Sequence, residues 1–446
     1  MKRILALALA GSMLASLAGC GGKDSGTTNS TPQAGGSSIS APEPAKTPDT
    51  VPESNGLNNE TIKGYPGSRF HDGLALISFQ DTASGQNYRG LIDTDGKLQM
   101  YAKDPGVERA EYDGEYVYLI TSNTFFVLNK DFELLSSHPR RNGDKDPIAA
   151  YGGGYVMTWE EKTGFDTSGY LYHVFDAAGK EISSLTPTPP YEREDVIYMG
   201  EGAFAIGHMN IYLAKQDQWL PDIEMSHTLD DGVVSLRFQD GLLVYYCDPD
   251  EGRFSYIDDK GSIQTVSVPE EYIQYPSYFG ATRGILMFQN FNTLDDKYVF
   301  CVYDTKSGQF KQYQGIYADR LEDTRSGYWP VCGEGYFAIA LRGADGQVYT
   351  VLLNENLEEL CEPVPGVPYA IQGDCLYTMK DGLTTYDLNG TELNQNGGIN
   401  PEGRAVDVFS DSILLYNFKH KYYRPDGSEV EYDFSTGKLA TLPQIP

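Results

Sequence analysis

The 446-residue sequence contains few of the residues that usually build helices and metal centres. It has only 3 Trp, 9 Met and 6 His, and after residue 20 it has no long run of Ala, Leu, Glu and Lys at helical spacing. No two histidines stand two or four positions apart, so the zinc pattern HExxH is absent. The GxSxG, GxxxxGK[ST] and CxxC motifs are also missing. These absences favour a non-enzymatic protein without metal or cofactor.

Cysteine is sparse as well. Of the 6 cysteines, Cys20 directly follows an N-terminal leader. The others are an odd number at wide spacing, which is not a disulfide framework: Cys247, Cys301, Cys332, Cys361 and Cys375. Three of them, Cys247, Cys301 and Cys375, have apolar or aromatic neighbours, which predicts buried free thiols. A single disulfide within the set stays open.

Basic residues are outnumbered. The chain has 34 Lys and Arg against 63 Asp and Glu, a net charge of -29. This charge repels nucleic acid and anionic membrane surfaces, and it is typical of a solvated surface. With so many carboxylates, the sequence cannot single out the two that a glycoside hydrolase needs.

The first 19 residues predict an export signal. Lys2 and Arg3 precede an apolar stretch from Ile4 to Ala18, which is too short to span a bilayer comfortably. The run Leu17-Ala18-Gly19-Cys20 resembles the lipobox of bacterial lipoproteins. The resemblance implies that Cys20 carries a lipid and becomes the N-terminus, which would anchor the chain to the extracytoplasmic face of the cell membrane. An ordinary secretory signal with a chance Cys is the alternative.

Residues 20–61 predict a tether. The segment is rich in Gly, Ser, Thr and Pro and has almost no large apolar residue, so it cannot bury enough surface to offset its ordering entropy. We expect it to be disordered and to lift residues 62–446 away from the membrane.

Residues 62–446 are repetitive and rich in Gly, Tyr and Phe, which favours strands and tight turns. A turn followed by two apolar runs recurs every 38 to 51 residues, beginning at Gly73, Gly114, Gly153, Gly202, Gly241, Gly284, Gly335, Gly373 and Asp411. This period is typical of the four-stranded blades of a β-propeller. We therefore expect an all-β fold, a single and monomeric propeller of about eight blades, within a range of seven to nine.

The turns are rich in oxygen-bearing side chains, as in Asp93–Gly96, Asp258–Gly261, Asp387–Gly390 and Pro425–Gly427. Asp, Asn and Gly there favour hairpin turns with positive φ and side-chain-to-backbone hydrogen bonds. A calcium site is the alternative, but no loop holds a full ligand set.

The first unit resembles the WG repeat of bacterial proteins. The matching stretches are Phe70-His-Asp-Gly73-Leu-Ala75 and Tyr88-Arg-Gly90-Leu-Ile92-Asp93-Thr-Asp-Gly96-Lys97. The match covers about 30 residues and weakens in later units, where the equivalent of Gly90 is usually lost. The resemblance implies a β-repeat scaffold used for binding and implies no known chemistry.

Trp159, Trp219 and Trp329 are the candidate ligand-binding residues, because large aromatic rings near strand ends can stack on sugars. The alternative is that they pack between blades. The sequence thus predicts a surface-exposed lipoprotein that presents loops to a protein, peptide or glycan. A carbohydrate-active hydrolase or lyase and an envelope assembly scaffold are the alternative functions.

A propeller must also join its ends. We expect residues 429–442, which alternate as a strand does, to pair in the sheet that contains residues 61–80. Stacking without closure would instead give an open solenoid.

Overall fold

The computed structural model describes residues 55–104, 106–141, 146–162, 169–186, 195–207, 210–220, 238–248, 252–269, 277–292, 297–322, 328–380, 382–394, 406–408, 414–416 and 421–442. The export signal, Cys20 and the tether as far as residue 54 lie outside these ranges. No helix in the described residues is long and apolar enough to cross a membrane. The one helix described there is the short 3-10 helix η3 (Ala318–Arg320).

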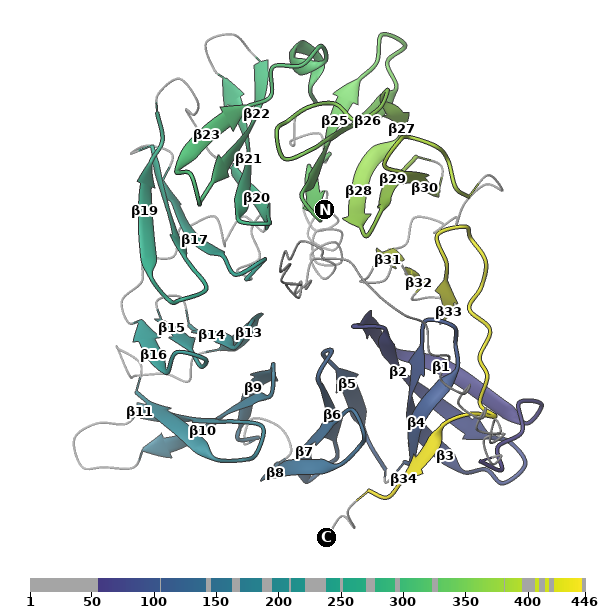
Figure 1. The fold of residues 1–446 in the computed structure, drawn as a ribbon. Coiled ribbons are helices and arrows are strands. Elements are labelled where there is room, and N and C mark those ends of the chain that lie inside the picture. Colours follow the sequence, from purple (N-terminus) through teal and green to yellow (C-terminus); the bar gives the residue numbers. More distant parts are fainter. Residues whose placement is uncertain are drawn as a thin grey trace, which may run out of the picture.

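The described residues form nine sheets, numbered here in chain order, which stand in a ring around a common centre (Figure 1). Their strands pair antiparallel, except for one parallel strand in sheet 1. Sheet 1 contains β1 (Ile62–His71), β2 (Leu74–Asp81), β3 (Asn87–Asp93), β4 (Leu98–Lys103) and β34 (Lys438–Ala440). Sheet 2 contains β5 (Arg109–Tyr112), β6 (Tyr116–Ile120), β7 (Thr124–Asn129) and β8 (Leu134–Pro139). Sheet 3 contains β9 (Ile148–Gly152), β10 (Tyr155–Lys162), β11 (Gly169–Phe175) and β12 (Glu181–Leu185).

Sheet 4 contains β13 (Val196–Gly200), β14 (Ala203–Ile206), β15 (Asn210–Leu213) and β16 (Gln218–Leu220). Sheet 5 contains β17 (Leu243–Asp248), β18 (Arg253–Ile257) and β19 (Ile263–Ser267). Sheet 6 contains β20 (Ser277–Thr282), β21 (Ile285–Asn292), β22 (Lys297–Asp304) and β23 (Gln309–Gln312). Sheet 7 contains β24 (Val331–Gly333), β25 (Tyr336–Arg342), β26 (Val348–Leu353) and β27 (Val364–Pro365).

Sheet 8 contains β28 (Val367–Gln372), β29 (Cys375–Met379) and β30 (Leu383–Asp387), and sheet 9 contains β31 (Val406–Val408), β32 (Leu414–Tyr416) and β33 (Lys421–Tyr423). Within each sheet, strands adjacent in the sequence are adjacent in space, the first strand lying nearest the centre of the ring (Figure 1). This arrangement is a β-propeller. The nine sheets are at the upper end of the range that the repeat predicts.

The core lies between neighbouring sheets, because the middle strands are buried on both faces. Every residue of β14 and β15 is buried, for example. Aromatic rings fill the gaps between sheets: Phe254 of β18 packs against Phe288 of β21 with their centroids 4.8 Å apart. The nearly continuous apolar runs of the sequence are therefore explained by blades that cover one another.

Two kinds of glycine turn repeat around the ring, as the sequence predicts. Five hairpins between the first two strands of a sheet, and the turn before β17, have two successive residues with positive φ, such as Asp72 (48°) and Gly73 (79°), which is the backbone of a type I′ turn. The outer hairpins begin with Asp or Asn. The carboxylate of Asp93, for example, accepts hydrogen bonds from the amides of Asp95 (3.0 Å) and Lys97 (2.9 Å). Asp258 and Asp387 do the same in their own turns, which confirms the turn interpretation.

The ring is closed by the C-terminal segment, as predicted. β34 pairs in parallel with β4 as a fifth strand of sheet 1, and Asp433 bridges to Lys97. Figure 1 shows this last segment passing from sheet 9 around the outside of sheet 1. On the inner side, the buried Tyr422 of β33 donates a hydrogen bond to the carbonyl of Ser68 in β1.

The cysteines follow the prediction as far as they are described. Cys301 and Cys375 are buried thiols outside any disulfide, and Cys332 and Cys361 form no disulfide either. Burial raises the pKa of the Cys301 thiol to about 12, which keeps it protonated and unreactive. The side chain of Cys247 lies outside the described residues.

Candidate binding site

Two large exposed apolar side chains lie on innermost strands, although the most exposed one described, Ile316 at 77%, lies in a connection. Ile197 of β13 is 61% exposed and Tyr65 of β1 is 52% exposed. Most other large exposed apolar residues of the described chain lie on outer strands or in connections, such as Leu134 on β8. Tyr151, Phe279 and Tyr369, also on innermost strands, are half-buried. The strands nearest the centre therefore combine aromatic and aliphatic side chains that solvent, or a ligand, can reach.

The three Trp residues are not brought together. All three are half-buried. Trp159 and Trp219 pack against one apolar cluster between sheets 3 and 4, and Trp329 stands edge-on to Phe279 with ring centroids 5.8 Å apart. The indole N–H of Trp159 donates to the carbonyl of Asp146 (2.8 Å), so only its ring remains to contact a ligand.

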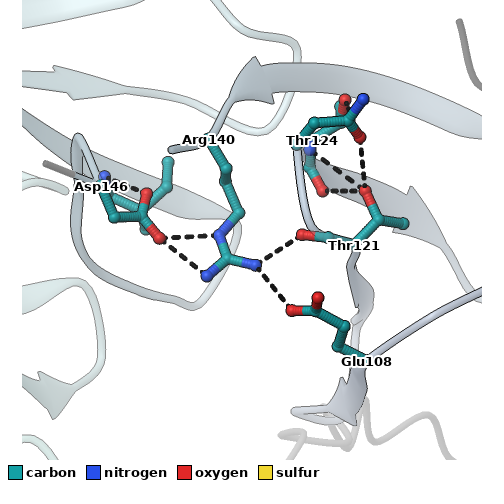
Figure 2. A network of polar contacts seen from close by, with 7 residues as sticks. Glu108, Thr121, Thr124, Arg140 and Asp146 are labelled. Atoms are coloured by element: carbon teal, nitrogen blue, oxygen red, sulfur yellow. Dashed lines mark hydrogen bonds and ion pairs between the residues drawn. The ribbon is translucent and has the colours of Figure 1, made fainter. Parts of the chain in front are cut away.

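Through Asp146, Trp159 contacts a polar network between sheets 2 and 3. Figure 2 shows the Arg140, Asp146, Thr121 and Glu108 side chains of this network. Nε and Nη2 of Arg140 both donate to one carboxylate oxygen of Asp146, at 2.8 and 2.7 Å. The third nitrogen donates to the carbonyl of Thr121 (2.5 Å) and reaches Glu108 at 3.5 Å. Because Arg140 and Asp146 are each less than one-fifth exposed, this ion pair is worth more than a surface pair. The network ties Arg140 to Asp146, the described residues at the two ends of the connection, and the carbonyl of Asp146 in turn holds the indole of Trp159.

Arg89 has the same role in the preceding sheet. Its Nε donates to Asp104 (2.9 Å), and the other oxygen of that carboxylate accepts the amides of Gly106 and Val107. The guanidinium also reaches the carbonyl of Val107. Arginine–carboxylate pairs are thus found both between sheets 1 and 2 and between sheets 2 and 3.

His138 of β8 lies two residues before Arg140 and is buried between sheets 2 and 3. Its ring packs against Phe175 (centroids 5.0 Å apart) and Phe125 (6.4 Å), and no described group hydrogen-bonds its Nε2. Burial lowers the pKa of His138 below its ordinary value, because the protonated ring would be charged inside an aromatic gap.

We expect His138 to make the domain less stable in mild acid. Since the pKa is lower in the folded chain, stability is complete above the unfolded value of about 6.5 and falls as the pH drops below it, by up to about 1.4 kcal/mol per pH unit. Urea unfolding at pH 7.5 and 5.5 should show a smaller loss in His138→Leu than in the wild type. Equal losses in the two proteins would contradict this assignment.

Carboxylates join neighbouring sheets at the inner turns. Asp113 accepts the hydroxyl of Tyr118 (2.6 Å) and, from sheet 3, the amide of Gly153 (2.8 Å). Glu201 accepts the amide of Gly241, and Asp240 accepts the amide of Arg283. These acids link sheet 2 to sheet 3, sheet 4 to sheet 5 and sheet 5 to sheet 6. In the described chain, no group of three or more His, Cys, Asp and Glu is placed to hold a metal ion.

Asp240 differs from the other perturbed acids. Desolvation raises its pKa, and the charge of Glu334 adds to the effect. Turn acids such as Asp81, Asp387 and Asp433 have a lowered pKa, because hydrogen bonds stabilise their charged forms.

Sequence reasoning missed Tyr65, Ile197 and the Arg140 network. The sequence repeat locates the strands. It does not show which side chains of an innermost strand are exposed, because this depends on how the sheets are arranged in the ring. The one available signal for the network was a charged stretch, which contains Arg140 and Asp146, between two apolar units.

No known family model and no curated protein matches the sequence. Solved structures similar to the chain include a eukaryotic initiation factor, at 15% identity and a TM-score of 0.43 over 77% of this chain and 92% of that one. An uncharacterised protein of Listeria monocytogenes matches at 12% identity and 0.33, over 86% and 96%. The Neurospora crassa Pan2 WD40 domain matches at 10% and 0.27, over 71% and 88%. The fold assignment rests on the sheet order and pairing described above.

Proposed function

We propose that the chain is a membrane-anchored, surface-exposed binding lipoprotein. Its propeller presents inner strands and loops to a protein, peptide or glycan ligand, and the lipid on Cys20 holds it on the extracytoplasmic face of the membrane through the tether. The lipobox-like run before Cys20 supports the anchor. The WG-repeat-like first unit supports a binding scaffold.

The observation that carries the proposal is the exposure of Tyr65 and Ile197 on innermost strands. Leaving large apolar side chains in water costs about 1.5–3 kcal/mol each relative to burial. A closed ring has many buried positions for such residues, so we take their exposure on innermost strands to favour contact with a ligand. The half-buried rings of Trp159, Trp219 and Trp329 are proposed as secondary contacts.

A hydrolase or lyase remains the second candidate, on one observation. The raised pKa of Asp240, close to the charge of Glu334, is the pattern of a carboxyl that can act as a general acid. Against it, Asp240 already accepts the amide of Arg283 at 2.7 Å, which gives it a structural role.

The test is a screen of the unlipidated Cys20→Ala chain against a glycan array and a random heptapeptide phage library. We expect the double variant Tyr65→Ser/Ile197→Ser to bind the selected ligand at least about tenfold more weakly, since two apolar contacts are lost. Leu134→Ser, which changes an exposed residue of an outer strand, is the matched control.

Unchanged affinity in the double variant would refute the inner-strand site. The recovered ligand also separates the two candidate functions. An intact ligand supports binding, whereas a cleaved ligand whose cleavage is lost in Asp240→Asn supports the enzyme.

A further inference from the structure

Sheet 5 ends in an open edge. Its outer strand, β19, pairs only with β18 in the described chain, and Figure 1 places it on the periphery of the ring. Four of its five residues are exposed, among them Ile263 at 46%. An exposed edge strand offers unpaired backbone N–H and C=O groups to another strand.

β19 lacks the features that protect several of the other outer strands. Its sequence, IQTVS, has no charge and no proline. By contrast, β8 ends in Pro139, β12 begins with Glu181 and β23 carries Lys311. β16 (QWL) lacks such residues too, but it is only three residues long and none of its residues is exposed. Bulges interrupt the outer pairings of sheets 1, 2 and 3, but β18 and β19 pair through all five residues without a register shift. β19 is therefore a regular, uncharged template for strand addition.

The pairing with β18 shows which backbone groups face outward. The amide of Val268 donates inward to Gly252 (2.7 Å), and the carbonyl of Ser262 accepts inward from Asp258 (3.1 Å). Since hydrogen-bonded residues alternate along an antiparallel strand, the even-numbered residues face β18. The amides and carbonyls of Ile263, Thr265 and Ser267 thus point away from the sheet.

The same fold already accepts an added strand at an equivalent edge. β34, only three residues long, pairs in parallel with the outer strand β4 of sheet 1. An outer strand of this ring therefore has the geometry to accept a fifth strand from an extended segment. At β4 the chain's own C-terminus fills the edge, whereas no described segment fills the edge at β19.

We propose that β19 binds an extended, lysine- or arginine-containing polypeptide segment by strand addition. Charge selects this partner. The whole chain carries a net charge of -29. A cationic strand would be attracted by this field, while the uncharged edge itself places no like charge against it. This site is separate from the innermost strands, so it stands or falls independently of the proposed function.

The experiment uses the unlipidated Cys20→Ala chain and the fluorescent peptide Lys-Val-Lys-Val-Lys-Val-Lys, followed by anisotropy. We expect binding to fall at least about tenfold in Ser267→Pro, because proline removes an outward donor and leaves the ladder with β18 intact. Ile263→Lys, which adds a positive charge to the edge, should weaken binding as well and does not depend on proline. The matched control is Gln312→Pro on β23, whose amide also faces outward because that of Tyr313 points inward.

Hydrogen exchange supplies a second readout. Adding the Lys-Val peptide should slow exchange at the amides of residues 263, 265 and 267. Equal binding of Glu-Val-Glu-Val-Glu-Val-Glu would overturn the charge argument, and unchanged binding in both edge variants would overturn the site. A dimer of the chain that Ser267→Pro dissociates would assign the edge to self-association instead.

Discussion

Deletion of residues 429–446 is expected to unfold the domain under conditions in which the full chain is folded. The deletion removes Val430 and Phe434, which are 2% and 3% exposed, and with them the fifth strand of sheet 1. It also removes the backbone carbonyl of Phe434 that accepts the side-chain amide of Asn55 (2.9 Å). Loss of a buried Phe side chain alone costs about 3–5 kcal/mol, against a total stability of about 5–15 kcal/mol for a domain.

The measurement is thermal unfolding followed by circular dichroism, together with the oligomeric state. Phe434→Ala isolates the packing contribution, because its ring lies 4.9 Å from that of Phe79 in the core of sheet 1. Leu439→Ala, half-exposed on β34, is the control and should change stability little. A truncated chain that stays monomeric and melts at the same temperature would show that the ring does not depend on this closure.

Closure and the turns could be predicted from the sequence because each depends on local pattern. Glycine next to Asp or Asn at a fixed period marks the hairpins, since only certain residues adopt positive φ without strain. The alternation of apolar and polar residues near the C-terminus indicated a strand without a hairpin partner. In a closed ring, such a strand can pair only where the last sheet meets the first. Its parallel pairing with β4, on the outer side of the sheet, could not be foreseen, because pairing direction depends on how the chain passes around sheet 1.

The candidate sites were harder to predict because they depend on contacts between sheets. Trp159 was chosen for its size, and its actual partner, the carbonyl of Asp146, lies across a connection that no local pattern reports. Tyr65 and Ile197 look like ordinary strand residues, and only their place on innermost strands makes them exposed. Likewise, the unpaired edge of β19 depends on where the other described segments of the chain lie, and its own sequence does not report this.

Asp113 illustrates how one side chain joins two sheets. One carboxylate oxygen accepts the amides of Glu115 (3.1 Å) and Tyr116 (2.9 Å) in its own turn. The other accepts the hydroxyl of Tyr118 and the amide of Gly153. The oxygen of Tyr118 in turn accepts the amide of Gly154 at 2.9 Å. A single carboxylate thus organises a chain of hydrogen bonds from sheet 2 into the hairpin of sheet 3.

We expect Asp113→Ala to be among the most destabilising single substitutions in the chain. It leaves the buried hydroxyl of Tyr118 and the amide of Gly153 without their acceptor, and each hydrogen bond to a charged group contributes about 1.5–3 kcal/mol. The expected loss in free energy of unfolding is therefore about 3–5 kcal/mol, measured by urea denaturation. Asp131→Ala, an exposed acid in the outer hairpin of the same sheet, removes the same charge and should change stability by no more than about 0.5 kcal/mol.

A double-mutant cycle with Tyr118→Phe distinguishes this network from a general charge effect. If the carboxylate acts through the hydroxyl, Asp113→Ala should cost less in the Tyr118→Phe background, because the unpaired hydroxyl is then gone. The charge of Asp113 contributes, with burial, to raising the pKa of Tyr118, so the phenol stays protonated and able to donate. Additive effects in the cycle, or equal losses for Asp113→Ala and Asp131→Ala, would show that sheets 2 and 3 are held together by apolar packing alone.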